Sequence, residues 1–299
     1  MFGDGSGVHK VGKGVVYAGE NLTELFNAAH VQPDFDYVKN NADSDMEFAH
    51  RKLKNGDIYF IDNRSNHDEL IDATFRVAGM QPELWHAETG RTEPASFKIA
   101  GRGTTVPLHL EAWGTVFVVF RKPTREPSHV APDPIQRKVA TFTGPWSVNF
   151  QPGRGAPASI ILDELADWSQ NSDPGVKYFS GVGTYTKTLQ ASPQWFKKGA
   201  RLWLDLGDVK NLAEVSINGK PLGQTWHEPY RVDVTSTLKP GTNEITIKVV
   251  NSWVNRMIGD EQPGATKITF ADVKPYKANS PLLPSGLLGP VTLIREDAD

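Results

Sequence analysis

The stretch Val215-Ser216-Ile217-Asn218-Gly219-Lys220 decides how the second half of this chain folds. Val215 and Ile217 alternate with a polar serine, which is the two-residue period of a β-strand with one buried face. Asn218-Gly219 follows directly, and this dipeptide is a strong hairpin signal because both residues tolerate positive φ angles. The stretch therefore predicts a strand, a two-residue turn and a returning strand that begins at Lys220.

The same two-residue period continues on both sides of this hairpin. Alternating apolar residues run from Leu202 to Leu206, from Ile245 to Val249, and again at Val291 and Leu293. About eight short strands in about 160 residues are typical of a jelly roll. We therefore expect residues 136–299 to form one jelly-roll domain.

Residues 41–122 also carry a strand pattern. Ile71, Ala73 and Phe75 alternate with polar residues, which indicates one buried and one solvated face. Val116–Phe120 is a continuous apolar run, and the runs in this region are bounded by turn residues. We therefore expect a β-sandwich domain over 41–122.

Two shorter segments complete the predicted organisation. Residues 1–40 hold a short strand at Val15–Tyr17 and a helix that Asn21 caps and that runs to about Ala29. Residues 123–135 contain four prolines, so we expect a semi-rigid linker that forms no β-ladder. The predicted fold class is all-β, with two β-sandwich domains and a short N-terminal strand-helix segment.

The composition excludes several classes of function. The chain has 299 residues, no cysteine and a formal net charge of -3. It can form no disulfide or thiolate zinc site, and it lacks the basic runs of a nucleic-acid-binding protein. No apolar stretch reaches the about 18 residues of a transmembrane helix, and Met1–Gly5 lacks the start of a signal peptide. We therefore expect neither nucleic acid nor membrane as a partner.

Several longer motifs resemble a known family. In chain order they are Pro33-Asp34-Phe35, His50-Arg51, Asp57-Ile58-Tyr59-Phe60 with Asn63, Glu83-Leu84-Trp85 with Thr89-Gly90, Thr143-Gly144-Pro145-Trp146-Ser147-Val148, Leu165-Ala166-Asp167-Trp168, Val176-Lys177-Tyr178-Phe179-Ser180-Gly181, Gly183-Thr184-Tyr185 and Gly241-Thr242-Asn243-Glu244-Ile245. Together with the hairpin stretch, this series resembles the C-terminal β-domains of the glycoside hydrolase family 106 α-L-rhamnosidases, including their galactose-binding-like sugar-binding domain. The resemblance covers nearly the whole chain.

The resemblance implies that the chain works with oligo- or polysaccharides and that 136–299 is a galactose-binding-like jelly roll. It also implies that the catalytic carboxylates lie on an N-terminal barrel that this chain does not contain, so a missing catalytic domain is an expected partner. The family suggests a secreted or periplasmic location. One departure is that Trp85 is followed by His86-Ala87-Glu88, where the family continues from its Trp with Asp-Pro.

Glycoside hydrolysis usually needs two carboxyl groups that flank the scissile bond, about 5–5.5 Å apart for retention and about 6.5–9.5 Å apart for inversion. The candidates are Asp45, Glu47, Glu88 and Glu228. Asp45 and Glu47 form a local acidic cluster with Asp43, close in sequence to His50-Arg51, and an arginine beside a carboxylate would keep it ionised. The alternative stays open that these acids are solvated loop and turn residues.

The loop Trp226-His227-Glu228-Pro229-Tyr230 is the strongest candidate for binding a sugar. Loops at one end of such a jelly roll hold the ligand, where an aromatic face stacks on the sugar and polar neighbours bond its hydroxyls. Further residues that could lie near the same end follow the strand at Ile245–Val250. The predicted sugar-binding residues are Trp226, His227, Glu228, Trp253 and Asn255. The alternative is that the two tryptophans cap the sandwich core.

Metal chemistry has a weak signal in this sequence, and no cofactor is expected to be required. The histidines show no pairing at metal-ligand spacing, and no metal-site residue is predicted from them. Asp163, Glu164 and Asp167 could supply oxygens to a structural Ca²⁺, which takes about six to eight such ligands. The alternative is an acidic turn on the surface.

Three hypotheses of function remain. The first is a carbohydrate-binding accessory part of a glycoside hydrolase that resembles the α-L-rhamnosidases. The second is a compact glycoside hydrolase in its own right, with an acid/base pair in a cleft between the two β-domains, since domain interfaces are common pocket positions. The third is an assembly module without a ligand, whose first 40 residues dock on a partner through an exposed apolar helix face.

Overall fold

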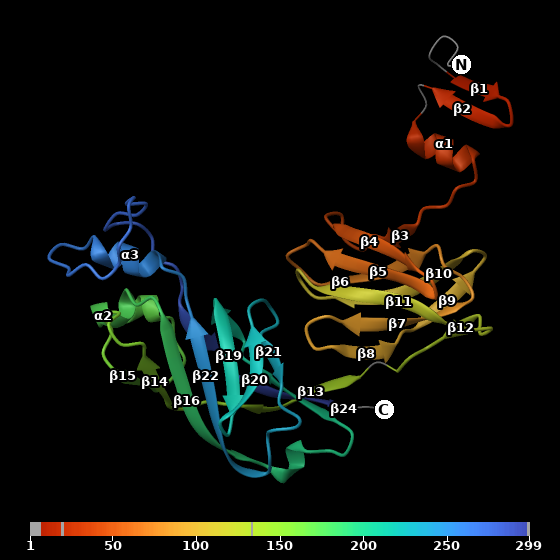
Figure 1. Cartoon of the computed structure of the whole chain (residues 1–299). Helices are drawn as coiled ribbons and strands as arrows, with labels where there is room; N and C mark the ends of the chain where they lie inside the picture. Colours follow the sequence, from red (N-terminus) through yellow and green to blue (C-terminus); the bar gives the residue numbers. More distant parts are fainter. Residues whose placement is uncertain (1–6, 19–20, 133, 298–299) are drawn as a thin grey trace. The chain divides into compact units, whose positions relative to one another are not determined.

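The computed structural model describes residues 7–18, 21–132 and 134–297 (Figure 1). The chain divides into two compact units, unit 1 at Met1–Ala131 and unit 2 at Pro132–Asp299. The opening stretch Met1–Gly5 and Asp133 of the predicted linker lie outside the described residues. Within these described ranges, no helix is both long and apolar enough to cross a membrane.

The N-terminal segment contains a hairpin followed by a short helix. Strands β1 (Gly7–Val11) and β2 (Gly14–Ala18) pair antiparallel. Helix α1 (Leu22–Ala28) begins after Asn21, whose side chain accepts a hydrogen bond from the Thr23 N–H, so the predicted cap is confirmed. The predicted apolar face is partly exposed, because Leu22 and Phe26 both face solvent. That exposure is what the docking hypothesis requires, and the docking itself stays a prediction.

Unit 1 contains a sandwich of two five-stranded sheets in which every strand pair is antiparallel. One sheet has the order β12 (Ser128–His129), β9 (Phe97–Ala100), β10 (Gly103–Leu110), β6 (Glu69–Phe75), β3 (Phe35–Val38). The other has the order β4 (Met46–Leu53), β5 (Gly56–Asn63), β11 (Thr115–Pro123), β7 (Met80–His86), β8 (Arg91–Pro94). The alternation predicted at Ile71, Ala73 and Phe75 is confirmed, since all three are buried in the core between these sheets.

The proline-rich linker differs from its prediction, because part of it does form a ladder. Ser128 and His129 pair with Lys98 and Phe97 as strand β12 at the edge of the first sheet. The neighbouring Pro127 also accepts a hydrogen bond from the Ile99 N–H at 2.7 Å. The expectation was wrong because proline lacks only the N–H, so its carbonyl and the residues between prolines can still join an edge.

Unit 2 contains a second sandwich, with a six-stranded and a four-stranded sheet, again antiparallel throughout. The six-stranded order is β15 (Ser159–Leu162), β14 (Trp146–Phe150), β16 (Val182–Ala191), β22 (Gly241–Val250), β19 (Leu212–Ile217), β20 (Lys220–Thr225). The four-stranded order is β13 (Ile135–Thr141), β24 (Thr292–Asp297), β17 (Arg201–Asp205), β21 (Arg231–Asp233). The predicted fold class of two β-sandwich domains is confirmed.

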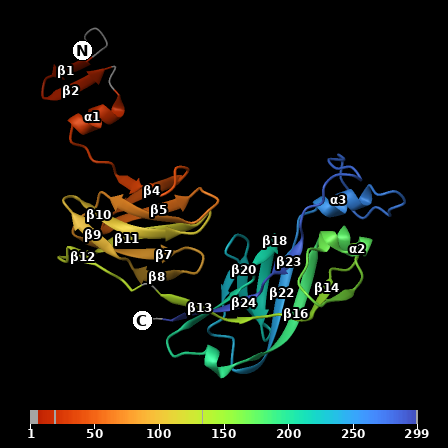
Figure 2. The same cartoon turned by 180° about the vertical axis from the view of Figure 1, so that it is seen from behind.

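Smaller elements connect the sheets of unit 2. A two-stranded pair joins β18 (Asp208–Lys210) to β23 (Gly286–Gly289), and it is visible from behind in Figure 2. The helical elements are η1 (Trp168–Gln170), α2 (Pro174–Lys177), η2 (Pro193–Trp195) and α3 (Val254–Asp260). The segment from α3 to β23 is irregular, and such long irregular segments in a compact domain are usually functional or need local anchors.

The hairpin that opened the sequence argument is confirmed. Ile217 pairs with Lys220 across Asn218-Gly219, whose φ angles of 53° and 78° are those of a type I′ turn. The turn is also tied to the start of β22. The buried Asn243 accepts a hydrogen bond from the Asn218 side-chain amide at 2.9 Å, and the Asn218 side-chain oxygen accepts one from the Glu244 N–H at 3.0 Å.

Candidate functional site

The loop predicted to bind sugar lies at one end of the six-stranded sheet of unit 2. Ala213 of β19 pairs with Thr225 of β20 on one side and with Val249 of β22 on the other. The last residues of β20 and β22 therefore lie at the same end, about 10 Å apart across β19. Trp226 and Trp253 follow these two strands, so both leave the sheet at this end.

The indole of Trp226 is the most accessible aromatic surface of this loop. Its residue is 68% exposed, and the His227 ring stands nearly perpendicular to it at 5.1 Å between ring centroids. The Nδ1 atom of His227 lies 2.7 Å from the Glu228 carbonyl oxygen, and because a carbonyl only accepts, this nitrogen carries the proton. The loop thus presents an indole beside the exposed Glu228 side chain.

A charged group that the sequence analysis missed lies beside this loop. The Lys210 ammonium is 2.6 Å from Asp208 on β18, and this contact raises the pKa of Lys210 against the opposing effect of burial. The negative charge of Glu228 acts in the same direction, so Glu228 and Lys210 lie within electrostatic reach of one another. Burial raises the pKa of Tyr230. The sequence near the loop could not reveal Lys210, because the pairing of β18 with β23 determines where Lys210 lies.

The other two predicted sugar-binding residues differ in their surroundings. Trp253 is 46% exposed, and the Arg154 guanidinium lies over its ring at 4.6 Å. Asn255 is buried instead. Its amide donates to the Leu283 carbonyl at 2.7 Å and accepts from the Leu283 N–H at 2.8 Å, with Ser285 also in reach. The Asn255 side chain therefore anchors the segment before β23.

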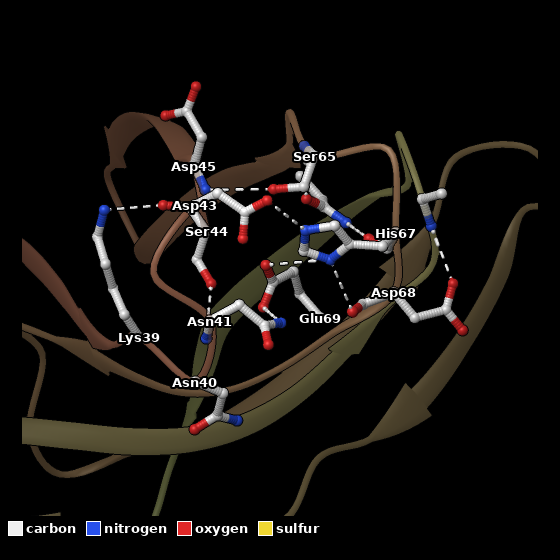
Figure 3. Close-up of polar contacts among 12 residues, drawn as sticks. Lys39, Asn40, Asn41, Asp43, Ser44, Asp45, Ser65, His67, Asp68 and Glu69 are labelled. Atoms are coloured by element: carbon white, nitrogen blue, oxygen red, sulfur yellow. Dashed lines mark hydrogen bonds and ion pairs between the residues drawn. The ribbon is translucent and has the colours of Figure 1, made fainter.

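Asp45 and Glu47 lie on unit 1, at the start of β4 (Figure 3 shows Asp45). Asp45 is exposed, and its backbone N–H donates to Ser65 Oγ at 3.3 Å. The arginine beside Glu47 is Arg64 at 3.1 Å, and it is not the expected Arg51. Four residues of extended strand separate Glu47 from Arg51 by about 13 Å, which explains the difference. Their catalytic role stays a prediction.

Asp43, the neighbour of Asp45, belongs to a polar cluster with His67 and Glu69 that the sequence analysis did not predict (Figure 3). His67 stands between Asp43, at 3.4 Å, and Glu69, at 3.5 Å. The carbonyl of Asp68 and these two carboxylates raise the pKa of His67, while desolvation opposes them. Glu69 is 0% exposed, and Asn41 donates to it at 3.4 Å. The raised pKa favours the imidazolium form of His67, whose charge compensates a buried carboxylate, and this is a structural task.

His50 has its own pair of carboxylates, away from Asp45 and Glu47. Its Nδ1 lies 2.7 Å from Asp34 and its Nε2 lies 2.9 Å from Asp57, and its ring stacks on Tyr59 at 4.0 Å. Because Asp34 precedes β3 and His50 lies on β4, this group connects the two sheets of unit 1.

Glu88 lies on the turn between β7 and β8 and is exposed. On the same hairpin, His86 Nε2 lies 2.8 Å from Glu93 Oε1, which Arg91 also contacts at 3.1 Å. The departure from the family motif thus occurs at a surface hairpin. The role of Glu88 as a catalytic acid stays a prediction.

Glu83 on β7 is buried, and its surroundings predict that the stability of unit 1 depends on pH. A hydrogen bond from Lys122 lowers the pKa of Glu83, with Trp85 and Arg121 adding to the effect and burial opposing it. A lowered pKa stabilises the fold above the ordinary value of 4.5, and this stabilisation is lost as the pH falls through the folded-state pKa. Glu83→Gln should therefore cost about 1 kcal/mol at pH 7.

Thermal unfolding of Glu83→Gln and of the wild-type chain between pH 3 and pH 7 measures this contribution. The difference in Tm should be largest at pH 7 and should shrink as the pH falls below about 4.5. Glu126→Gln, at an exposed position, is the matched control and should follow the wild type. A difference that is constant over the whole pH range would contradict the assignment.

In the described residues, no group of three or more His, Cys, Asp or Glu side chains could hold a metal ion. The predicted calcium ligands Asp163 and Glu164 are exposed. The Asp167 carboxylate accepts hydrogen bonds from the Ser169 N–H and hydroxyl, both at 2.8 Å, and from the Ser285 N–H at 2.9 Å. Asp167 thus caps η1 and holds the segment before β23, and a structural Ca²⁺ there stays a prediction.

Comparison with known proteins connects both units to glycoside hydrolases. Residues 1–99 match glycoside hydrolase family 106, which is described as alpha-L-rhamnosidase. Residues 176–279 match the family described as glycosyl hydrolase 2 galactose-binding domain-like, and this range includes the Trp226 loop, Trp253 and Asn255.

Two individual proteins are similar over longer ranges. A rhamnosidase structure from Novosphingobium sp. PP1Y is 47% identical with a TM-score of 0.92, and the match covers 98% of this chain and 28% of that one. A curated protein of Formosa agariphila, named "Putative beta-glucuronidase", is 37% identical over 186 residues, which are 54% of this chain and 16% of that protein. The chain thus spans less than a third of either relative.

The resemblance stated from the sequence is confirmed by these matches. The chain corresponds to β-domains of a glycoside hydrolase family 106 α-L-rhamnosidase-like protein, and its second unit contains a galactose-binding-like domain.

Proposed function

We propose that unit 2 binds a saccharide at the Trp226 loop, as a carbohydrate-binding accessory part of a rhamnosidase-like glycoside hydrolase. The observation that carries the proposal is the 68% exposed indole of Trp226 at the end of the sandwich, on the same loop as the exposed Glu228, which in turn lies within electrostatic reach of Lys210. An indole that is open to solvent next to residues able to form hydrogen bonds offers one ligand both a stacking surface and polar partners.

The chemistry of the loop suits a sugar. The apolar C–H face of a pyranose packs on an indole face, and its hydroxyls exchange hydrogen bonds with charged neighbours. Glu228 supplies carboxylate acceptors, and the Lys210 ammonium supplies donors. The two side chains are close enough to act on one another electrostatically, which places an acceptor and a donor in the same region of the loop.

Isothermal titration calorimetry with rhamnose-containing oligosaccharides tests the proposal. Trp226→Ala should weaken binding about tenfold or more, because it removes the indole on which the ligand stacks. Trp113→Ala removes another exposed indole, at 58% exposure in unit 1, and serves as the matched control that should bind like the wild type. A folded wild-type chain that binds no such glycan would contradict the proposal.

The alternative of a compact hydrolase with an acid/base pair between the two domains stays a prediction. It requires turnover by the isolated chain, for example the release of a nitrophenol from aryl glycosides. Sustained turnover that Asp45, Glu47, Glu88 or Glu228 variants abolish would favour the hydrolase over the accessory role. An inactive chain that binds glycan favours the accessory role.

A further inference from the structure

The cations that flank the Trp226 loop are paired with carboxylates of the protein itself. Lys210 Nζ lies 2.6 Å from Asp208. Arg231, the first residue of β21 after the loop, donates from Nε to Asp205 at 2.8 Å. The fold positions both pairs, because Asp208 and Lys210 lie on the same strand β18 and Asp205 and Arg231 are register partners of β17 and β21. The positive charges of the site are therefore already compensated from within the fold.

The carboxylate of Glu228 is in a different situation. It is exposed on the loop that carries Trp226, and the contact at Lys210 belongs to Asp208. A ligand stacked on the Trp226 indole would therefore meet the uncompensated negative charge of Glu228. A carboxylate accepts hydrogen bonds from sugar hydroxyls, whereas a carboxylate on the sugar has no proton to donate and is repelled.

We infer that the Trp226 site selects uncharged sugars and discriminates against uronic acids, with Glu228 as the residue that sets this preference. This inference rests on the proposed function, because it specifies the ligand class of the same site. Glu228 contributes in two ways. It accepts hydrogen bonds from ligand hydroxyls, and it repels a ligand carboxylate that would otherwise approach Lys210.

The experiment uses glycoside pairs that differ only at the sixth carbon. Methyl glucoside and methyl galactoside are each titrated into the protein, and so are the methyl glycosides of glucuronic and galacturonic acid with their carboxylates free. Methyl rhamnoside is a further neutral probe. All titrations are carried out at pH 8, where an ordinary histidine is neutral, so that the charge of His227 does not change the comparison. The wild-type chain should bind the neutral member of a pair about tenfold more tightly than the uronide.

Substitution at Glu228 assigns the preference to a residue. In Glu228→Gln the ratio of the two affinities should fall to about one, because the repulsion is gone while a hydrogen-bonding amide remains. Glu244→Gln removes the same charge at an exposed position at the start of β22, which is the opposite end of the sheet. This control variant should keep the wild-type ratio.

The outcomes separate this inference from the proposed function. If none of the glycosides binds to the folded chain and rhamnose-containing oligosaccharides also fail, the proposed function itself is wrong, and the inference with it. If sugars bind at Trp226 but the uronides bind as well as the neutral partners, or better, the proposed function stands and the charge preference is overturned. A preference for neutral sugars that survives in Glu228→Gln overturns the role of Glu228.

Discussion

Asp260→Ala is expected to destabilise unit 2 by about 3 to 5 kcal/mol, because it leaves a buried arginine without its partner. Asp260 and Arg256 are each 5% exposed and lie 3.0 Å apart on successive turns of α3. The carboxylate also accepts hydrogen bonds from the Ile268 N–H at 3.1 Å and from the Thr269 N–H and hydroxyl at 2.7 and 2.5 Å. Loss of the Asp260 carboxylate would also release the irregular segment after α3, which these hydrogen bonds hold.

The pKa of Asp260 is consistent with this task. Burial alone would raise it, but the hydrogen bonds from Thr269 and Ile268, with the charge of Arg256, bring it below its ordinary value. The carboxylate therefore stays ionised at neutral pH, and its charge compensates the guanidinium. Any substitution that removes the negative charge should expose the same deficit.

Urea unfolding of the Asp260→Ala chain measures the loss, with the exposed Asp272→Ala on the same segment as the matched control. The double variant Asp260→Ala/Arg256→Met should recover part of the stability, because it removes the unpaired charge as well. A loss below about 1 kcal/mol in the single variant would mean that water reaches the pair, against the burial described above.

Trp168→Ala is expected to cost a further large amount, about 3 to 5 kcal/mol, through the cavity that it opens in the core of unit 2. The indole is 1% exposed and stacks on Tyr185 with an angle of 7° between the rings. Phe150 and Phe179 contact it edge-on, both at 5.4 Å. The core cannot easily close around the missing ring, since three aromatic neighbours of fixed geometry surround it.

The backbone also fits this ring closely. A Cβ added to Gly183 would lie 2.4 Å from Trp168, so the strand β16 approaches the indole at a distance that only glycine allows. Gly183→Ala is therefore a second way to disturb the same contact. Urea unfolding checks both variants, and Ile161→Ala, at an exposed position of β15, is the control that should change little. A Trp168→Ala chain as stable as the control would contradict the described packing.

The parts of the fold that the sequence predicted are those that local chemistry determines. Asn218-Gly219 predicted its turn because two successive positive φ angles are costly for most other residues. The alternation at Ile71, Ala73 and Phe75 predicted a half-buried strand because one face of β6 meets the core. The cap at Asn21 depends on a contact only two residues away. None of these requires knowledge of a distant partner.

The candidate sites were less predictable, because contacts across long sequence separations build them. The Trp226 loop was found from its composition, but Lys210 reaches it only through the pairing of β18 with β23. Glu47 is paired with Arg64 because β4 and β5 form a hairpin, whereas closeness in sequence suggested Arg51. Asn255 was a candidate by position alone, and its burial followed from the course of the segment after α3.

The hydrogen bonds between Asn218 and the start of β22 have a consequence for the opposite end of the sheet. Strand β20 runs from this turn directly to Trp226, so the turn fixes where the strand ends. A slip of one residue in the pairing of β20 would turn every side chain along it to the other face. For the saccharide binding that we propose at Trp226, substitutions at Asn243 are therefore expected to alter the affinity from a distance, and a mutational map of binding should highlight a residue that never meets the ligand.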